Sequence, residues 1–429
     1  MSTTTKTIYE YYLKSGKVST DTRQITPGSV FFALKGPKFN ANAFAEEALA
    51  KGAGYAVVDE ERFVKDDRFL LVEDGLTALQ ELAKHHRSKL TIPFIGLTGS
   101  NGKTTSKELI NAVLSKKFKT YATKGNLNNH IGVPLTILAI DRTCEVAVIE
   151  MGANHLGEIA LLSSIANPTH GLITNIGRAH IGTFGGFENI LRAKSELYQH
   201  LITHEGVVFI NSQNELLANM AKRFNAPVLY PAKGNYYEAA LISADPFVKV
   251  RAENGAEVTT QLVGGYNFEN IAAALCIGKY FGVDAKEANK AIEEYLPGNM
   301  RSQVIIKGTN TIILDAYNAN PSSMEAAINN LAAIKAANKV AILGDMYELE
   351  EETEKEHKKL GSLLKEKGIS AYLCGELIQV AKEVFPQGNY FTSKEALLQS
   401  LKENPIQDST ILIKASRGMA LEKIMDEGF

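Results

Sequence analysis

The segment from Gly96 to Ile110, GLTGSNGKTTSKELI, contains the residue types that point most directly to chemistry. An apolar strand leads into a glycine-punctuated turn, and Gly-Lys-Thr-Thr then begins a helix. Such a turn points backbone N–H groups inward at the positive end of a helix, where they bind phosphate oxygens. We expect Lys103 at the β- and γ-phosphates of a nucleotide and the Thr104 hydroxyl on Mg²⁺. The expected phosphate-binding residues are Gly99, Ser100, Asn101, Gly102, Lys103, Thr104 and Thr105.

The same segment departs from the strict pattern G-x₄-G-K-[ST], because Leu97 stands where that pattern has its first glycine. A plain glycine-rich turn is therefore the alternative interpretation. The motif also leaves the acceptor of the γ-phosphoryl group open, since water, a hydroxyl and a carboxylate can all accept it.

Three further residues follow in the same block, and two of them lie at predicted strand ends. Glu150 ends the apolar strand VAVIE, and His180 follows the end of HGLITNI. Ligands of α/β sheets bind outside the carboxyl ends of the strands, so both side chains are candidate Mg²⁺ ligands. An ordinary loop acid and a structural histidine are the alternatives. Lys194 lies on an amphipathic helix, where the residue type alone predicts a solvated cation.

The elements that must position these residues belong to a long, ordinary globular chain. It has 429 residues, 45% hydrophobic and 22% charged, and 46 basic against 48 acidic residues give a formal net charge of −2. This length predicts about three domains, and the charge balance argues against nucleic acid as a partner. The scattered Cys144, Cys276 and Cys374 predict small buried side chains in a reducing compartment. With no apolar leader and no membrane span, we expect a cytoplasmic protein.

Three blocks follow one another, and the fold class they predict is α/β. Residues 1–90 mix short strands (SVFFAL, GYAVVD) with helical patterns. Residues 91–300 alternate apolar strands with helices, which predicts a parallel sheet covered on both faces, with an antiparallel edge after Pro231. Residues 301–429 follow the break YLPGNMRSQ and predict a Rossmann-like unit.

Taken together, the motifs resemble those of the Mur ligases, the ATP-dependent amide-forming enzymes of peptidoglycan synthesis. TGSNGKTT, EMGANH and AH…AKSE are similar to the central domain of that family in order and spacing. KGNLNNHIGVPLTIL at 124–138, LDAYNANPSSMEAA, LGDMYELE and KASRGMALE are similar to the branch that adds D-alanyl-D-alanine to UDP-muramoyl-tripeptide. STDTRQITPGSVFFALKGPKFNANAF resembles the uridine-nucleotide region, although FNANAF stands where many relatives have Asp-Gly-His.

The resemblance implies a reaction and a set of residue roles. The substrate carboxylate accepts the γ-phosphoryl group, and the resulting acyl phosphate reacts with the dipeptide amine to release phosphate. The implied catalytic residues are Lys103, Glu150, His180 and Lys194, and the implied ligands of two Mg²⁺ ions are Thr104, Glu150, His180 and Lys194. In this family the lysine of A-K-x-E is carbamylated by CO₂, which makes Lys194 an anionic oxygen donor, as hard Mg²⁺ prefers.

The remaining implied contacts are spread over all three blocks. The ATP contacts are Asn267 and Asn270 near the adenine, and Arg301, Asp315, Tyr317 and Asn318 from the third block. The substrate contacts are Asp21, Thr22, Arg23, Lys35 and Gly36 in the first block, Asn126, Asn128 and Asn129 at the peptidyl group, and Lys414, Ser416 and Arg417 at the dipeptide carboxylate. Helix caps, Asx turns and solvated side chains are the alternative readings of these residues.

We expect a monomer whose third domain closes over ATP when the ligands bind. Two other functions remain open. One is a related ligase of the folylpolyglutamate synthetase type, which the first ninety residues and GNLNNHIGVP disfavour. The other is a P-loop nucleotide switch, which would need no second metal site.

Overall fold

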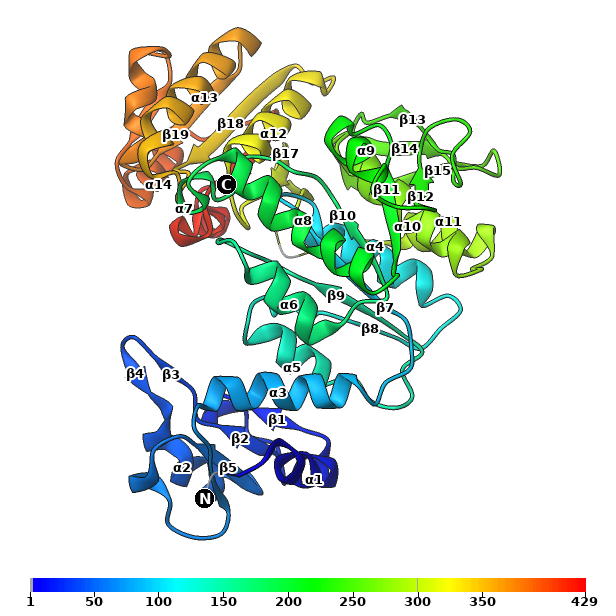
Figure 1. The fold of residues 1–429 in the computed structure, drawn as a ribbon. Coiled ribbons are helices and arrows are strands. Elements are labelled where there is room, and N and C mark those ends of the chain that lie inside the picture. The colour runs from blue at the N-terminus through cyan, green and yellow to red at the C-terminus, as the bar shows by residue number, and fades with distance from the viewer. Residues whose placement is uncertain (1–2, 299) are drawn as a thin grey trace.

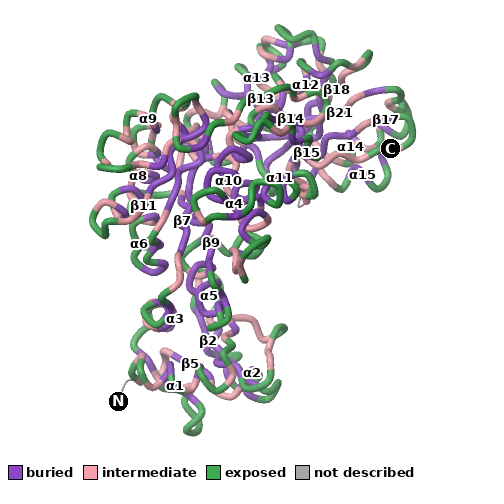
Figure 2. The backbone as a smooth tube through the Cα atoms, turned by 90° about the vertical axis from the view of Figure 1, so that its right-hand side faces the viewer, coloured by how far each residue is buried: buried purple, intermediate pink, exposed green. Residues whose placement is uncertain are grey.

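The computed structural model describes residues 3–298 and 300–429, which form three α/β units in chain order (Figure 1). The N-terminal unit lies at one end of the molecule, the central unit in the middle, and the C-terminal unit packs against the central one. The buried backbone is concentrated in the sheets and the helices that face them (Figure 2). The expected fold class is confirmed.

The N-terminal unit is built on a small parallel sheet in the order β1-β2-β5-β6. A short hairpin projects from it, and the helices lie around the sheet. The bounds are β1 Val18–Ser19, β2 Val30–Phe32, β3 Lys35–Gly36, β4 Phe39–Asn40, β5 Tyr55–Val58, β6 Phe69–Leu71, α1 Thr5–Ser15, α2 Ala45–Ala50 and α3 Gly75–Arg87.

Buried hydrogen bonds join this unit to the central one. The Tyr12 hydroxyl donates to the Leu138 carbonyl at 2.7 Å, and the buried Arg87 guanidinium donates to the carbonyls of Ala166 and Asn167 at 2.8 Å. These carbonyls belong to the C-terminal ends of helices in the central unit, where they have no partner within the helix. The junction is therefore held by satisfied polar contacts as well as by apolar packing.

The central unit contains a six-stranded, wholly parallel sheet in the order β12-β11-β10-β7-β9-β8. Every residue of β7 and β9 is buried, because helices cover both faces. The strands are β7 Phe94–Thr98, β8 Thr120–Ala122, β9 Val146–Glu150, β10 His170–Ile173, β11 Val207–Asn211 and β12 Val228–Tyr230. The helices are α4 Lys103–Leu114, α5 Gly132–Leu138, α6 Glu158–Ala166, α7 Ile181–Phe184, α8 Phe187–Thr203, α9 Glu215–Ala221, α10 Asn267–Tyr280 and α11 Ala285–Glu294.

The antiparallel strands after Pro231 differ from the expectation in one respect: they form a sheet of their own rather than an edge of the parallel sheet. They are β13 Ala240–Ser243, β14 Phe247–Arg251 and β15 Glu257–Val263. Val248, Val250 and Val258 are buried, whereas alternating residues face outward. Strands that are apolar on one face pack against helices α10 and α11, whereas a central parallel sheet needs strands that are apolar on both faces.

The C-terminal unit has a six-stranded sheet in the order β16-β17-β21-β18-β19-β20, in which only the β16–β17 pair is antiparallel within the described residues. Its strands are β16 Gln303–Lys307, β17 Asn310–Leu314, β18 Asn338–Gly344, β19 Ser370–Cys374, β20 Asn389–Phe391 and β21 Ser409–Lys414. Its helices include α12 Pro321–Ala333, α13 Thr353–Lys367, α14 Lys394–Glu403 and α15 Ile424–Glu427, and the 3₁₀ helix η4 Glu350–Glu352 precedes α13.

The cysteines and the helices bear on what the composition predicts. Cys144, Cys276 and Cys374 are all free and buried, as expected for small apolar side chains. Among the helices of residues 3–298 and 300–429, none is long and apolar enough to cross a bilayer.

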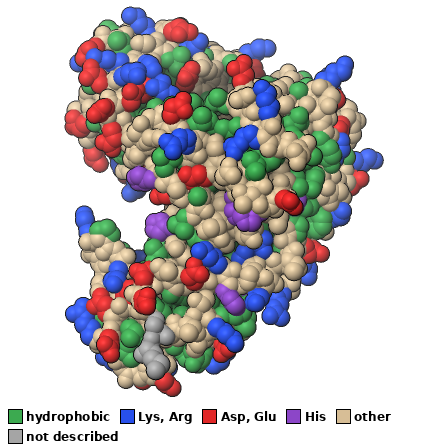
Figure 3. Space-filling model, viewed as in Figure 1, with side chains coloured by type: hydrophobic (Ala, Val, Ile, Leu, Met, Phe, Trp, Pro, Cys, Tyr) green, Lys and Arg blue, Asp and Glu red, His purple; other side chains and the backbone are tan. Residues whose placement is uncertain are grey.

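The C-terminal unit is docked on the central one, and a deep notch opens on one side of the molecule between the N-terminal and C-terminal units (Figure 3). Arg178 of the central unit forms ion pairs with Glu356 at 2.5 Å and Glu352 at 3.4 Å. The Asn320 amide donates to the Asn101 side chain at 2.8 Å. Helix α7 packs directly against η4.

Gly182 is a closely packed point of this interface, and a substitution there should weaken the docking. A Cβ at Gly182 would lie 2.6 Å from the carbonyl carbon of Leu349 and 2.5 Å from Cγ of Glu350. Since alanine is favoured inside a helix, the cost of Gly182→Ala comes from the interface alone, and overpacking costs about 1–3 kcal/mol. We expect a larger radius of gyration by small-angle X-ray scattering. A scattering curve identical to wild type would contradict this reading of the interface.

Candidate active site

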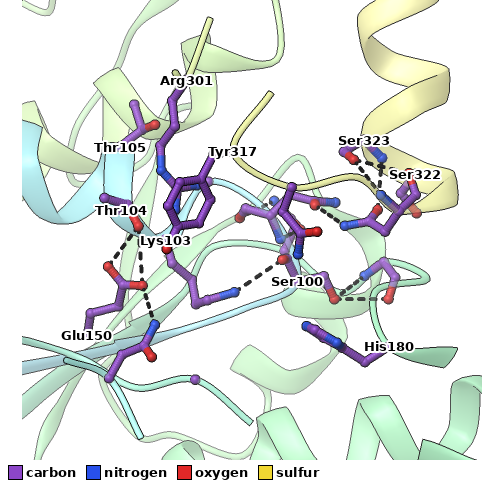
Figure 4. Close-up of a pocket in the computed structure, with 18 of the residues that line it drawn as sticks. Ser100, Lys103, Thr104, Thr105, Glu150, His180, Arg301, Tyr317, Ser322 and Ser323 are labelled. Carbon is purple, nitrogen blue, oxygen red and sulfur yellow. Dashed lines mark hydrogen bonds between the residues drawn. The ribbon is translucent and has the colours of Figure 1, made fainter. Parts of the chain in front are cut away.

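A cavity of about 710 Å³ opens at the carboxyl ends of the central strands and is covered by the C-terminal unit (Figure 4). Residues that are far apart in the sequence line it together. Of the predicted residues, the cavity is lined by Ser100, Asn101, Gly102, Lys103, Thr104, Thr105, Asn126, Asn128, Asn129, Glu150, His180, Asn267, Asn270, Arg301, Asp315, Tyr317, Asn318 and Lys414.

The glycine turn between β7 and α4 has the conformation that its sequence predicts. Gly99 has φ +148° and Gly102 has φ +77°, which are conformations that side chains disfavour. A Cβ would also lie 2.0 Å from the Thr174 hydroxyl at Gly99 and 2.7 Å from the Asn270 amide oxygen at Gly102. Leu97 departs from the strict pattern because it lies inside β7, fully buried, so the turn begins only after Thr98.

Neighbouring loops hold the turn in place. The Ser100 hydroxyl donates to the Gly177 carbonyl at 2.9 Å, and the Asn101 N–H donates to the Asn175 side chain at 3.0 Å. The Lys103 ammonium donates to the Gly99 carbonyl at 2.7 Å. Burial lowers the pKa of Lys103 to about 8, while Glu150 opposes this shift. The cavity therefore presents the N-terminus of α4, which no side chain caps, and a lysine whose charge is poorly solvated.

Glu150 is almost wholly buried, with 1% of its surface exposed, and lies directly beside the start of α4. The parallel register pairs it with Leu97, which places the end of β9 next to the turn. The Thr104 hydroxyl donates to one carboxylate oxygen at 3.0 Å, and the Asn128 amide donates to the other at 2.8 Å (Figure 4). A buried carboxylate next to a threonine hydroxyl is the oxygen-rich donor set that Mg²⁺ prefers, so these residues fit the predicted ion.

Lys194 is buried in α8 with 2% of its surface exposed, which differs from the solvated cation that its residue type predicts. Its ammonium donates to the Ala153 carbonyl at 3.2 Å and lies 5.3 Å from the Phe184 ring centroid. None of the ion pairs among the described residues involves it. Burial, and then the charge of Lys103, lower the pKa of Lys194 to about 7. Ala153 lines the cavity, so Lys194 lies immediately behind its wall.

His180 lines the cavity from the other side, where Nδ1 forms a hydrogen bond with the Glu348 carboxylate of the C-terminal unit. No group of three or more His, Cys, Asp or Glu side chains within residues 3–298 and 300–429 is spaced to hold a metal ion. The predicted metal set includes a hydroxyl and a modified lysine, so its assembly stays a prediction.

The C-terminal unit contributes one cation–π contact and one ion pair to the cavity. The Arg301 guanidinium stacks over the Tyr317 ring, 3.8 Å from its centroid. The buried Lys414 ammonium pairs with the Asp315 carboxylate at 2.6 Å and donates to the Asn318 carbonyl at 3.0 Å. Lys414, expected at the dipeptide, and Asp315, expected at ATP, are thus direct partners.

The predicted adenine contacts lie at the first turn of α10. The Asn270 amide donates to the Asn267 side chain at 2.9 Å and accepts from the Ser106 hydroxyl at 2.9 Å. Asn267 donates to the Val263 carbonyl at 2.8 Å. In the loop before α5, the Asn129 side chain accepts the N–H of Gly132 at 2.8 Å, and Asn126 lines the cavity.

Comparison with known proteins decides the family. The Mur ligase middle domain matches residues 97–278, and the glutamate ligase domain of Mur ligases matches residues 300–417. The chain is 37% identical to the UDP-N-acetylmuramoyl-tripeptide--D-alanyl-D-alanine ligase of Bacillus subtilis, over 96% of this chain and 92% of the relative. The chain belongs to the Mur ligase family. The resemblance inferred from the motifs is confirmed.

Solved Mur ligase structures show the same architecture over the whole chain. MurF from Acinetobacter baumannii is 32% identical, with a TM-score of 0.87 over 96% of this chain and 93% of that one. MurF from Thermotoga maritima, solved in complex with ADP, is 26% identical, with a TM-score of 0.84 over 96% of both chains. The N-terminal unit, which neither family model spans, is therefore part of the shared fold.

Several predicted residues lie away from the cavity wall of this Mur ligase. Ser416 accepts the Tyr347 N–H at 2.9 Å, and the exposed Arg417 pairs with Glu422 at 2.8 Å. In the N-terminal unit, Arg23 pairs with Asp21 at 2.6 Å, next to Thr22, and Lys35 pairs with Asp59 at 3.2 Å, next to Gly36. Their roles toward substrate stay predictions.

Glu196 is a residue to which the motif A-K-S-E gave no role, and its contacts explain why it accompanies Lys194. Its carboxylate accepts the N–H groups of Gly157 at 2.7 Å and Ala160 at 2.8 Å, at the N-terminus of α6. Lys194 binds the Ala153 carbonyl of the same loop. One turn of α8 thus holds the loop that follows Glu150 at Ala153 and at its junction with α6. The spacing of the motif was the signal for this pair.

Proposed function

We propose that this Mur ligase joins D-alanyl-D-alanine to UDP-N-acetylmuramoyl-tripeptide, with ATP converted to ADP and phosphate. The full-length likeness to a ligase of that name supports this reaction. The observation that carries the proposal is the hydrogen bond between Asn128 and Glu150. It joins the segment KGNLNNHIGVP, typical of the D-alanyl-D-alanine-adding branch, to the carboxylate beside the phosphate-binding turn.

The reaction needs two anions to meet, and the cavity supplies compensating positive charge. The tripeptide carboxylate attacks the γ-phosphorus, so an O–P bond forms to the carboxylate and ADP leaves with the electrons of the broken P–O bond. The N–H groups at the start of α4 and the Lys103 ammonium stabilise the charge on the transferred group. Arg301, held against Tyr317, adds a second cation from the C-terminal unit.

The second step forms the amide. The neutral amine of the dipeptide attacks the acyl carbon, the acyl C–O bond breaks, the amine loses a proton, and phosphate leaves with the bridging oxygen. Because the C-terminal unit covers the cavity, it excludes water that would otherwise hydrolyse the acyl phosphate. We assign the dipeptide to the region of Lys414, Ser416 and Arg417, and the uridine group to the N-terminal unit.

Thr104 and Glu150 are the proposed ligands of one Mg²⁺ ion, and Glu150, His180 and carbamylated Lys194 are those of a second. Bound there, the ions supply neutralising charge for the β- and γ-phosphates and for the substrate carboxylate. The assignment of Thr104 and Glu150 is supported by their direct contact.

Carbamylation of Lys194 is supported by its surroundings. A buried ammonium without an ion-pair partner is costly, which favours the neutral amine. The neutral nitrogen attacks CO₂, an N–C bond forms as one C=O π bond opens, and a proton is lost to give an anionic carbamate. Lys194 donates to the Ala153 carbonyl, and Ala153 lines the cavity, so a carbamate on Lys194 would lie next to the cavity wall.

ATP and a UDP-linked substrate belong to the cytoplasm, where we place the enzyme, acting as a monomer. The alternative is a nucleotide switch that hydrolyses ATP without the other substrates. The test is phosphate release measured with ATP alone, with each second substrate, and with both. Release that requires both supports the ligase, whereas equal release from ATP alone supports the switch.

A further inference from the structure

The contact between His180 and Glu348 is a feature of the cavity that the proposed reaction leaves unexplained. His180 belongs to the central unit and Glu348 to the C-terminal unit, 168 positions later in the chain. The hydrogen bond joins Nδ1 of the imidazole to one carboxylate oxygen. The His180 side chain is partly buried, with 22% of it exposed, whereas the Glu348 side chain is exposed, at 43%.

Glu348 lies in a loop that the C-terminal unit fixes by itself. The Met346 N–H donates to Nε2 of the buried His357 at 3.0 Å, and the Tyr347 N–H donates to Ser416 at 2.9 Å. At the start of the loop, the Asp345 carboxylate accepts the Ile378 N–H at 2.8 Å. The loop therefore has a defined backbone, from which the Glu348 side chain extends toward the central unit.

His180 is held less firmly by its own unit. It precedes α7 with φ +57°, a left-handed conformation that is uncommon for residues other than glycine. Its carbonyl accepts the Thr183 hydroxyl at 3.0 Å, which fixes the backbone. Within the described part of the chain, the imidazole has a single hydrogen-bond partner, Glu348. The orientation of the ring thus depends on the neighbouring domain.

The chemistry of imidazole connects this contact to metal binding. A carboxylate on Nδ1 fixes the proton there, so Nε2 keeps its lone pair for a metal ion. Histidine ligands in metalloproteins commonly have such a carboxylate or carbonyl partner, which sets both tautomer and ring orientation.

We propose that Glu348 is a positioning residue for the second metal site, supplied by the C-terminal domain. The carboxylate holds the His180 ring through Nδ1, which would leave Nε2 available to the ion, so that the site would be complete only when the C-terminal domain is docked. This inference rests on the proposed function of His180 as a ligand. It gives domain docking a chemical consequence, because an undocked enzyme has one metal ligand without its partner.

The same interface provides a matched control. Glu352 also reaches across the interface from the segment that follows Glu348, and it pairs with Arg178 rather than with His180. Its removal weakens docking through an ion pair but leaves the imidazole contact intact. The backbone of Glu348 also keeps its hydrogen bond from the Gly182 N–H, 3.2 Å long, when only the side chain is changed.

The test is the affinity of the full-length protein for Mn²⁺, measured by electron paramagnetic resonance with a non-hydrolysable ATP analogue present. Loss of an outer carboxylate partner costs about 10- to 100-fold in metal affinity, so we expect Glu348→Ala to weaken the second Mn²⁺ by at least about tenfold. Glu348→Gln keeps an acceptor for Nδ1–H and should stay within about threefold of wild type. Glu352→Ala should bind Mn²⁺ as wild type does.

Two results would overturn the inference. One is unchanged Mn²⁺ affinity in Glu348→Ala, and the other is an equal loss in Glu348→Ala and Glu352→Ala, which would assign the effect to docking alone. His180→Ala separates the inference from its premise. If that variant keeps both ions, His180 is no ligand and the premise fails; if it loses one while Glu348→Ala keeps both, only the role of Glu348 fails.

Discussion

Glu150→Gln should lower the rate of amide formation by at least about 100-fold, equivalent to about 2.7 kcal/mol in the barrier. The substitution preserves the volume of a side chain that is 1% exposed and leaves an oxygen that accepts from Thr104 or Asn128. It removes the negative charge that would bind the ions opposite the triphosphate. The measurement is kcat with both substrates saturating, over a range of magnesium concentrations.

One further variant and one stability measurement show whether the loss comes from the missing charge. Asn128→Ala removes one donor to Glu150 but leaves the carboxylate, so we expect a smaller loss of about tenfold. Thermal unfolding should show that Glu150→Gln is at least as stable as wild type, because a buried carboxylate is costly to desolvate. A Glu150→Gln enzyme within threefold of wild type would show that this carboxylate does not hold a catalytic ion.

Lys194→Met should lower kcat by about 100-fold or more, whereas thermal unfolding should show no loss of stability. Methionine fills a similar space in α8 but cannot form a carbamate. In the unmodified protein the lysine carries a poorly solvated charge with the Ala153 carbonyl as its hydrogen-bond partner, so replacement by an apolar chain removes a desolvation cost. A structural lysine would show the opposite pattern, with stability and activity lost together.

The matched control for Lys194 is Arg192→Met, on the exposed face of the same helix. It should leave activity within about twofold of wild type. A smaller variant, Lys194→Ala, leaves space for a short carboxylate such as formate, which should restore part of the activity by supplying the missing oxygens. Full activity in Lys194→Met would show that the reaction does not need a carbamate on Lys194.

The sequence predicted most elements of the fold because their signals are local. The strand that ends at Thr98, the turn of positive-φ glycines and the helix that begins at Lys103 follow from residue types alone. Glu150 could be placed beside that turn because parallel strands end at one edge of a sheet. The antiparallel strands were assigned to the wrong sheet, since one-sided apolar patterns reveal the face that is buried but not the element that covers it.

Local sequence patterns do not predict contacts between segments that are far apart in the chain. Nothing in the local sequence pairs Lys414 with Asp315, because that contact depends on which strands are neighbours in the C-terminal sheet. Nor does it pair His180 with Glu348, because that contact depends on how two units dock. Lys194 illustrates the same limit: an amphipathic helix predicts an exposed lysine, and only the packing of α8 shows that it is buried. The family resemblance singled out Lys194, and the spacing of A-K-S-E also marked Glu196, whose contacts became clear only in the fold.

The most direct test of the central claim follows the oxygen atoms of the reaction. The tripeptide substrate is prepared with ¹⁸O in the carboxylate that becomes the amide, and the released phosphate is analysed by mass spectrometry. An acyl phosphate requires one ¹⁸O atom per phosphate, because the oxygen that attacks the γ-phosphorus leaves with it. A parallel reaction uses unlabelled substrate in ¹⁸O-labelled water. Phosphate that takes no ¹⁸O from the substrate in the first reaction, and one ¹⁸O from water in the second, would contradict an acyl phosphate.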